Sequence, residues 1–243
     1  MRHKEKFFKN RDEVHLWCVS LSDEMHDLAA LYGVLSAEEQ ARVNNYRYEK
    51  DRTKAIISRG HLRFLLGRYL DVAPKTMPLL TTEFGKPYLP DSKISFNVSH
   101  AMDQVVYGVT VSRNIGVDIE SIARKVDHLG IAGRFFTEEQ IMAIKSVSED
   151  GRSAEFLKYW TLKEAYLKAT GMGLAGSLHS FSVVPDAAGA VYRIQRTATA
   201  SLLEGWTLRH FFPVPGYVTS LAVEGEEWHL KVMAADGSVL CPE

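Results

Sequence analysis

The sequence predicts an α+β protein of two similar halves, each a long helix packed on an antiparallel sheet. Two observations support this fold class. First, long helical stretches near residues 50–69 and 160–168 each lie beside short alternating strands, without regular β-α-β alternation. Second, the order of elements is similar in the two halves, although no residue-level repeat is present. A linker near residues 112–114 divides the chain into residues 1–113 and 114–243.

In the first half, Ser36 and Glu39 form a capping box, with the serine as N-cap and the glutamate at N3. They predict a short helix that ends near residue 45. The long stretch at residues 50–69, rich in Arg, Leu and Ile, predicts the main helix. Four prolines between residues 74 and 90 indicate loops and short strands. The predicted strands are residues 14–20, 94–98 and 104–111.

In the second half, Thr137 and Gln140 form another capping box, which predicts a helix to about residue 147. A polar break at residues 148–153 separates it from the helix that contains residues 160–168. Glycines at residues 171–176 end that helix, because they suit positive φ angles. The predicted strands are residues 116–120, 181–184, 191–195, 206–211 and 217–223. The segment after residue 224 gives no clear prediction.

The composition is that of an ordinary globular protein, with 243 residues, 46% hydrophobic and 24% charged. A formal net charge of -1 gives no overall attraction to nucleic acid or to anionic lipid. Two cysteines, Cys18 and Cys241, do not make a disulfide framework and fit a reducing compartment. The charged residues 1–13 do not resemble a signal peptide, and no apolar run is long enough to cross a membrane. We therefore expect a cytoplasmic protein that binds neither nucleic acid nor membranes.

The segment GVDIE at residues 116–120 alternates apolar residues with acids. In a strand, Val117 and Ile119 would point into a core, whereas Asp118 and Glu120 would emerge together on the other face. Two carboxylates that close repel each other unless a proton or a cation lies between them. The alternative interpretation is the solvated face of an edge strand, and taken alone the two are equally favoured.

The helix at residues 160–168 offers a third carboxylate. Trp160, Glu164 and Lys168 are spaced four apart and form one ridge. The simpler interpretation of this ridge is a surface pair between Glu164 and Lys168, and the helix alone favours it. Together with the acidic strand, however, three carboxylates and nearby lysines predict a hard divalent cation that holds a phosphate-bearing ligand.

Other candidate groups are cationic or polar. Ser99 and His100 are neighbours on a strand, so they point to opposite faces and do not suit a nucleophile–base pair. They suit two donors to a phosphate at a strand end. A basic cluster in a neutral molecule is either a solvated helix or a docking site for a terminal phosphate. Its members are Arg42, Arg47, Lys50, Arg52, Lys54, Arg59 and Arg63.

Five motifs in order resemble the 4′-phosphopantetheinyl transferases of the Sfp type. They are FGKP at 84–87, FNVSH at 96–100, GVDIE at 116–120, RFF at 134–136 and WTLKEAYLK at 160–168. The resemblance covers roughly residues 36–185. It implies a pseudo-duplicated, monomeric fold with coenzyme A in the cleft between two α+β halves. It also implies transfer of the phosphopantetheine group from coenzyme A to a serine of an apo acyl or peptidyl carrier protein, with release of adenosine 3′,5′-bisphosphate.

The resemblance also implies roles for the acidic residues and two lysines. Asp118, Glu120 and Glu164 would hold Mg²⁺ against the pyrophosphate of coenzyme A. Lys163 and Lys168 would lie near the same phosphates. Glu164 and Lys168 would take part in catalysis, and Glu164 would accept the serine proton directly or through water.

The remaining coenzyme A contacts would come mainly from the first half. Ser99 and His100 would contact phosphate, and Lys86 would lie in the nucleotide pocket. The family's 3′-phosphate contacts fall within residues 36–54, where a close relative would carry a lysine in place of Glu39. The candidates for that role are Arg42, Lys54 and, as a substitute, Arg47.

Two other functions use the same residues. One is a different phosphoryl-transfer or pyrophosphate-cleaving enzyme, which would label no protein. The other is a non-catalytic coenzyme A-binding regulatory module, which the full set of carboxylates disfavours because binding alone needs no metal triad. The surface near residues 135–136 is a plausible dock for a carrier protein.

Overall fold

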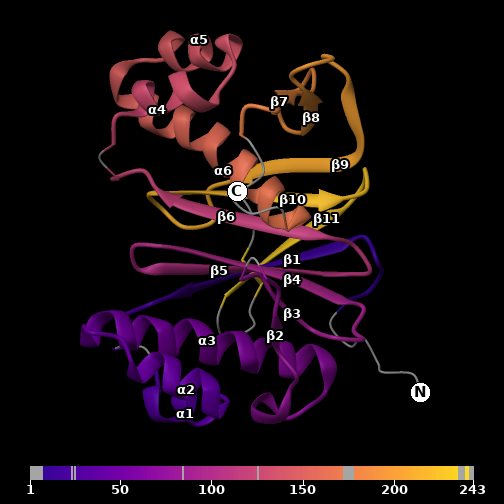
Figure 1. Cartoon of the computed structure of the whole chain (residues 1–243). Helices are drawn as coiled ribbons and strands as arrows, with labels where there is room; N and C mark the ends of the chain where they lie inside the picture. The colour runs from indigo at the N-terminus through magenta and orange to yellow at the C-terminus, as the bar shows by residue number, and fades with distance from the viewer. Residues whose placement is uncertain are drawn as a thin grey trace.

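Two five-stranded sheets form the middle of the molecule, and helices cover both outer sides (Figure 1). The structure is a computed structural model that describes residues 8–22, 24, 26–83, 85–124, 126–171, 178–234 and 239–240. In Figure 1, α1, α2 and α3 lie on the side of the first sheet, and α4, α5 and α6 on the side of the second. The α+β class with one long helix in each half is confirmed.

The first sheet has the strand order β12-β11-β1-β5-β4. Its strands are β1 (Glu13–Ser20), β4 (Ile94–Ala101), β5 (Gln104–Val111), β11 (His229–Ala234) and β12 (Val239–Leu240). The second sheet has the order β6-β10-β9-β8-β7. Its strands are β6 (Ile115–Ser121), β7 (Phe181–Pro185), β8 (Tyr192–Arg196), β9 (Leu202–Phe211) and β10 (Tyr217–Glu224). A small hairpin pairs β2 (Leu80–Thr81) with β3 (Pro87–Tyr88).

The helices are α1 (Leu28–Gly33), α2 (Ala37–Asn44), α3 (Glu49–Leu70), α4 (His128–Phe135), α5 (Glu138–Ser146) and α6 (Arg152–Thr170). The main helices α3 and α6 are the two that the sequence predicts. α1 and α4 are short, and the sequence analysis did not predict them. Both predicted capping boxes are present, with reciprocal side-chain bonds at the N-termini of α2 and α5.

Alternation along the strands builds three separate cores. Trp17 and Tyr107 of the first sheet pack with residues of α3. Leu16 and Val106, the strand neighbours of those two residues, belong to a core shared with strands of the second sheet. α6 packs with strands of the second sheet in a third core. Because successive side chains on a strand point to opposite faces, each sheet is apolar on both sides and can be covered on both.

The chain after Glu224 returns to the sheet of the first half. β11 pairs with β1 in parallel, with Glu13 opposite His229, whereas every other strand pair among the described residues is antiparallel. This parallel pair departs from the purely antiparallel sheets that the sequence predicts. The division at residue 113 stays a prediction, and β11 is a strand from beyond it that joins the sheet of the first half. Phe84, Cys241 and most of the glycine cluster at 171–176 lie outside the described residues.

A buried network of polar side chains connects β1 with β11. His15 of β1 is 1% exposed, and its Nδ1 lies 2.6 Å from the hydroxyl of Tyr69. Its Nε2 lies 3.3 Å from Glu13 Oε2, and Lys231 of β11 donates to the other oxygen of Glu13 at 2.7 Å. The ring of Phe8 stacks on the imidazole of His15, with 4.1 Å between the ring centroids. Burial lowers the pKa of His15 to about 4.

We expect the free energy of unfolding to decrease as the pH falls from 6.5 toward 4. The unfolded chain protonates this imidazole near its ordinary pKa of 6.5, whereas the folded protein does so only near 4. Within that window the unfolded state therefore binds more protons, and acid favours it. Urea denaturation at several pH values measures this slope, and His15→Gln should flatten it. Equal slopes for the variant and the wild type would contradict the assignment to His15.

Among the described helices, none is long and apolar enough to span a lipid bilayer.

Candidate active site

The strand β6 and the helix α6 of the candidate site approach each other very closely at Gly116. A Cβ atom at this glycine would lie 1.9 Å from the carbonyl oxygen of Ala165 and 2.4 Å from the amide nitrogen of Ala169. Only hydrogen fits there, so glycine lets β6 lie directly against α6. This contact brings the acidic face of β6 next to the predicted ridge of α6.

A cavity of about 370 Å³ lies where these elements meet the end of β4. It is lined by Val98, Ser99, His100, Asp118, Ile119, Glu120, Trp160, Glu164 and Lys168. The structure therefore brings together the three predicted carboxylates, the predicted ridge of α6 and the two polar residues of β4.

One hydrogen-bonded cluster in the lining of this cavity consists of Asp118, Lys168 and Ser99. Lys168 Nζ donates to Asp118 Oδ1 at 2.6 Å and to Ser99 Oγ at 2.9 Å. The Ser99 hydroxyl donates to the same Asp118 oxygen at 2.9 Å. Asp118 is 5% exposed. The other carboxylate oxygen of Asp118 is buried and has no hydrogen-bond partner.

Glu120 and Glu164 complete the acidic side of the cavity. Burial and the negative charge of Asp118 raise the pKa of both carboxyl groups. Glu120 pairs with Arg124 at 2.7 Å. One carboxylate oxygen of Glu164 is buried without a partner. Unsatisfied oxygens and raised pKa values are the features that a bound cation would relieve, so these residues fit a hard divalent ion.

The carboxylates are not arranged as a ready-made ligand cluster. Within the described ranges, no three His, Cys, Asp or Glu side chains are grouped closely enough to hold a metal ion. Lys168 forms an ion pair with one carboxylate oxygen of Asp118, and Arg124 forms an ion pair with Glu120. The assignment of Asp118, Glu120 and Glu164 as metal ligands therefore stays a prediction, supported by their shared cavity and by the two orphaned oxygens.

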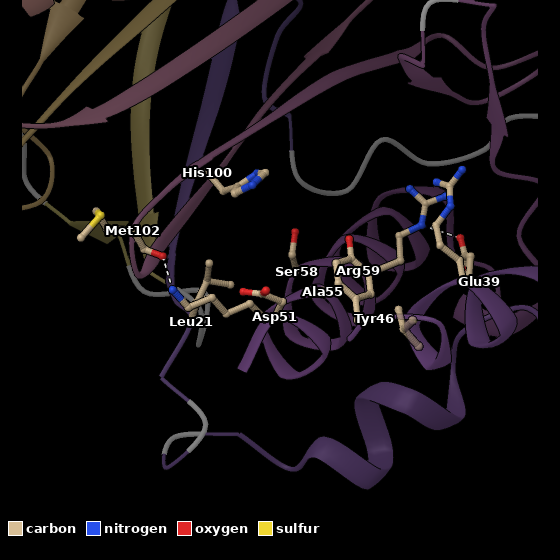
Figure 2. Close-up of a pocket in the computed structure, with 12 residues that line it drawn as sticks. Leu21, Glu39, Tyr46, Asp51, Ala55, Ser58, Arg59, His100 and Met102 are labelled. Atoms are coloured by element: carbon tan, nitrogen blue, oxygen red, sulfur yellow. Dashed lines mark hydrogen bonds and ion pairs between the residues drawn. The ribbon is translucent and has the colours of Figure 1, made fainter. Parts of the chain in front are cut away.

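A second and larger cavity, of about 420 Å³, lies between α2, α3 and the turn that follows β4 (Figure 2). It is lined by Leu21, Glu39, Arg42, Val43, Tyr46, Asp51, Lys54, Ala55, Ser58, Arg59, His100 and Met102. We call it the basic pocket, because it contains Arg42, Lys54 and Arg59. His100 lines both cavities, so it lies at the point where they meet.

Glu39 offsets part of the positive charge of this pocket. Its two carboxylate oxygens accept from Arg59 Nε and Arg63 Nε, both at 2.5 Å, and Figure 2 shows it beside Arg59. These arginines hold the pKa of Glu39 low despite its burial. Glu39 also accepts from the Ser36 amide in the capping box. The glutamate thus has a structural role, and Arg42 and Lys54 are the predicted cationic candidates that remain in the pocket.

Arg47 does not line the basic pocket. It is exposed, and its guanidinium lies over the ring of Tyr48 at 5.3 Å. Arg59, which the sequence analysis placed only in the general basic cluster, lies in the pocket instead. The signal that could have found it is helical spacing, because Ala55 and Arg59 are four residues apart and line the pocket together.

Lys163 does not lie near the predicted phosphate position. It is fully buried, and Nζ donates to the carbonyl oxygens of Phe135, Leu178 and Phe181 at 2.8, 2.9 and 2.9 Å. Its neighbour Glu164 lines the carboxylate cavity, and successive helical residues point about 100° apart. The placement of Lys163 beside the pyrophosphate is therefore wrong, and this lysine joins α6 to the end of α4 and the start of β7.

Lys86 lies at the C-terminus of α6. Its Nζ donates to the carbonyl oxygens of Lys168 and Ala169 at 2.7 and 3.0 Å. Those carbonyls are orphaned at a helix end, where a cation is favoured. Lys86 also lines a groove with Pro87, Asn97 and Leu167. Its predicted contact with the nucleotide stays a prediction.

Comparison with known proteins agrees with these features. Residues 114–222 match the family model for the 4′-phosphopantetheinyl transferase superfamily, and residues 21–112 match the model for the N-terminal part of a 4′-phosphopantetheinyl transferase. The 4′-phosphopantetheinyl transferase HetI of Nostoc sp. is 34% identical over 226 residues, which cover 90% of this chain and 91% of HetI. The chain belongs to the 4′-phosphopantetheinyl transferase superfamily. The recognition made from the five motifs is confirmed.

Two further relatives of this transferase superfamily member are more distant. The 4′-phosphopantetheinyl transferase Sfp of Bacillus subtilis is 29% identical over 150 residues, which cover 61% of this chain and 66% of Sfp. A holo-(acyl-carrier-protein) synthase from Bacillus anthracis, solved in complex with CoA (3′,5′-ADP), is 22% identical with a TM-score of 0.39. That match covers 46% of this chain and 96% of the synthase.

Proposed function

We propose that this protein transfers the 4′-phosphopantetheine group of coenzyme A to a serine of an apo acyl or peptidyl carrier protein. The observation that carries the proposal is the pair of cavities that share His100. The basic pocket suits the 3′-phosphate of the nucleotide, and the carboxylate cavity suits a metal-bound diphosphate. Membership of the superfamily supports the same reaction.

Asp118, Glu120 and Glu164 would hold Mg²⁺ in this enzyme. The two orphaned oxygens and the raised pKa of Glu164 support that assignment. The bound ion would supply Lewis-acid polarisation of the diphosphate and offset its charge. Lys168 lies on the same helix ridge as Glu164 and would supply a second positive charge at the diphosphate.

The reaction is a displacement at phosphorus. The serine oxygen of the carrier forms a bond to the β-phosphorus of coenzyme A, and the bond from that phosphorus to the bridging oxygen breaks. Adenosine 3′,5′-bisphosphate leaves with the electron pair, and Lys168 offsets its developing charge. Glu164 would accept the serine proton, directly or through water, because its carboxylate lies in the same cavity as Asp118 and Lys168.

The direct test is to mix the protein with coenzyme A, Mg²⁺ and a panel of apo carrier proteins. Intact mass spectrometry should detect one phosphopantetheinyl group on at least one carrier, with loss of labelling when the metal is chelated. Tight coenzyme A binding with no carrier labelled would support the non-catalytic module instead. Release of nucleotide without labelled protein would support a pyrophosphate-cleaving enzyme.

The basic pocket predicts which substitutions weaken binding of the 3′-phosphate. Arg42→Ala and Lys54→Ala should each weaken coenzyme A about tenfold, because each removes a charged contact to phosphate. Dephospho-coenzyme A, which lacks that phosphate, should bind the variants and the wild type alike. Isothermal titration calorimetry measures both ligands.

The matched control for this series is Arg52→Ala. Arg52 lies on the same helix as Lys54, pairs with the exposed Glu49 and does not line the basic pocket. Its affinity for coenzyme A should stay within about twofold of the wild type, because an exposed pair contributes little. Equal losses for both nucleotides in the Arg42 and Lys54 variants would contradict the assignment of this pocket to the 3′-phosphate.

We also propose that the protein acts as a cytoplasmic monomer, as its resemblance to the Sfp-type enzymes implies. Light scattering after size-exclusion chromatography should then give the mass of one chain, 27.3 kDa. Cell fractionation with an antibody to the protein should recover it with cytoplasmic markers. A larger mass, or recovery with membranes, would contradict the respective half of this proposal.

A further inference from the structure

The two sheets are joined by side chains at a pair of strands that share no ladder. β4 ends the first sheet and β6 ends the second, and each has a hydrogen-bonded strand neighbour on one side only. The amide of Val117 in β6 donates to Asn97 Oδ1 at 2.9 Å, and the amide of Ile119 donates to Ser99 Oγ at 3.4 Å. Side chains of β4 thus take the place that backbone carbonyls would have in a sheet.

The two bonds have the same spacing along the chain. In each, the partner lies 20 residues further on, so β4 and β6 run in the same direction at this contact. Asn97 and Ser99 are 4% and 5% exposed. A buried amide that loses its acceptor costs free energy, so this pair of bonds favours a single register between the two strands.

The Ser99 hydroxyl uses all three of its hydrogen-bonding positions within the protein. A hydroxyl offers one donor and two acceptor lone pairs. Its donor is directed to Asp118 Oδ1 at 2.9 Å, and it accepts from Lys168 Nζ at 2.9 Å and from the Ile119 amide. The hydroxyl therefore orients the acidic and basic groups of the second half from the first half.

We infer that Asn97 and Ser99 are positioning residues, which align the basic pocket of the first half with the carboxylate cavity of the second. Asn97 sets the register between β4 and β6. Ser99 holds the carboxylate of Asp118 and the ammonium of Lys168 in place. The importance of this alignment for catalysis rests on the proposed function. The hydrogen bonds themselves can be tested without an activity assay.

Amide hydrogen exchange tests the Asn97 bond directly. In Asn97→Ala, the Val117 amide should exchange about tenfold faster than in the wild type, because its acceptor is gone. Asn97→Asp keeps an oxygen at the same position and should restore most of the protection. Tyr107→Phe is the matched control, since it removes one buried hydrogen bond from the same sheet, to the carbonyl of Ser58. Unchanged exchange at Val117 in Asn97→Ala would overturn the inference for this residue.

Two ligand titrations test Ser99. Ser99→Ala should weaken the binding of Mn²⁺ alone about tenfold, because the Asp118 carboxylate loses its orienting bond. The affinity for coenzyme A in the presence of EDTA should fall much less, since Lys168 keeps its bond to Asp118 when the hydroxyl is removed. Ser99→Thr keeps the hydroxyl and should restore Mn²⁺ binding.

The opposite pattern would overturn the inference for Ser99. A large loss of metal-free coenzyme A affinity with normal Mn²⁺ binding would make the hydroxyl a phosphate ligand. Should Asn97→Ala fail to fold, Ser99→Ala carries the exchange test at the Ile119 amide, where faster exchange is again expected. Absence of transfer activity in the wild type would refute the proposed function, yet it would leave the exchange and metal-binding results intact.

Discussion

We expect Gly116→Ala to destabilise the protein by about 3 kcal/mol, the upper end of what overpacking usually costs. The added Cβ would lie 1.9 Å from the carbonyl oxygen of Ala165 and 2.4 Å from the amide of Ala169. Both contacts are with the backbone of α6, so no side chain can rotate away, and the helix itself must move. Urea denaturation measures the loss.

Activity should fall further than the loss of stability explains. Asp118 lies two residues from Gly116 on β6, and its partner Lys168 lies on α6, the helix that would be displaced. We therefore expect at least about a hundredfold loss of transfer in the folded fraction, since misplacing reacting groups by about 1 Å can cost this much. Intact mass spectrometry of the carrier, at a temperature where the variant is folded, gives that number.

Gly133→Ala is the matched control for this substitution. Gly133 lies within α4, and apart from its chain neighbours and the backbone of its own helix, no atom lies within 4 Å of the position that its Cβ would take. Alanine is favoured over glycine inside a helix by about 0.5–1 kcal/mol. The control should therefore be neutral or slightly more stable. A Gly116→Ala protein as stable and active as this control would mean that β6 and α6 are not in such close contact.

Local signals in the sequence predicted the elements that build the site. The capping box at Ser36 fixed the start of α2, because the required side-chain and backbone bonds involve residues only three apart. The alternation in residues 116–120 predicted the buried and acidic faces of β6, and Val117 and Ile119 are indeed buried in the core shared by both sheets. The four-residue spacing on α6 predicted which side chains share the cavity.

Long-range pairings could not be predicted in the same way. β11 pairs with β1, and Glu13 lies opposite His229 from the far end of the chain. Alternation along a strand indicates which face is buried but does not identify the neighbouring strand. The ion pair between Glu13 and Lys231 depends on that pairing, so no local pattern could have indicated it. The same holds for the bond between Asn97 and Val117.

Lys163 shows how a resemblance can misplace a residue that periodicity places well. The ridge formed by Trp160, Glu164 and Lys168 excludes Lys163, because a helix turns about 100° per residue. The buried lysine is tolerated since three carbonyl oxygens accept its three ammonium protons. Burial lowers the pKa of Lys163 to about 7, because it disfavours the charged ammonium. The three hydrogen bonds favour the ammonium and so oppose this effect. The motif lysine thus serves the packing of the helix that presents its neighbours.

A loss of catalysis of similar size, without a loss of stability, should come from Glu164→Gln. The substitution keeps the size of the side chain but removes the charge that would bind metal and the oxygen that would accept a proton. We expect kcat to fall at least about a hundredfold, the scale of general base catalysis. The affinity for coenzyme A in the presence of EDTA should stay within about twofold, since the basic pocket lies in the other half of the molecule.

Titration of Mn²⁺ into this variant separates the two roles of Glu164. Weaker metal binding together with the loss of turnover would make the glutamate chiefly a metal ligand, which its orphaned buried oxygen favours. Normal metal binding with lost turnover would make it chiefly the base. The control is Glu155→Gln, on the same helix, whose carboxylate pairs with Lys158 and lines neither cavity. Near-wild-type turnover in Glu164→Gln would exclude both roles, and the transfer chemistry would then need another group in this cavity.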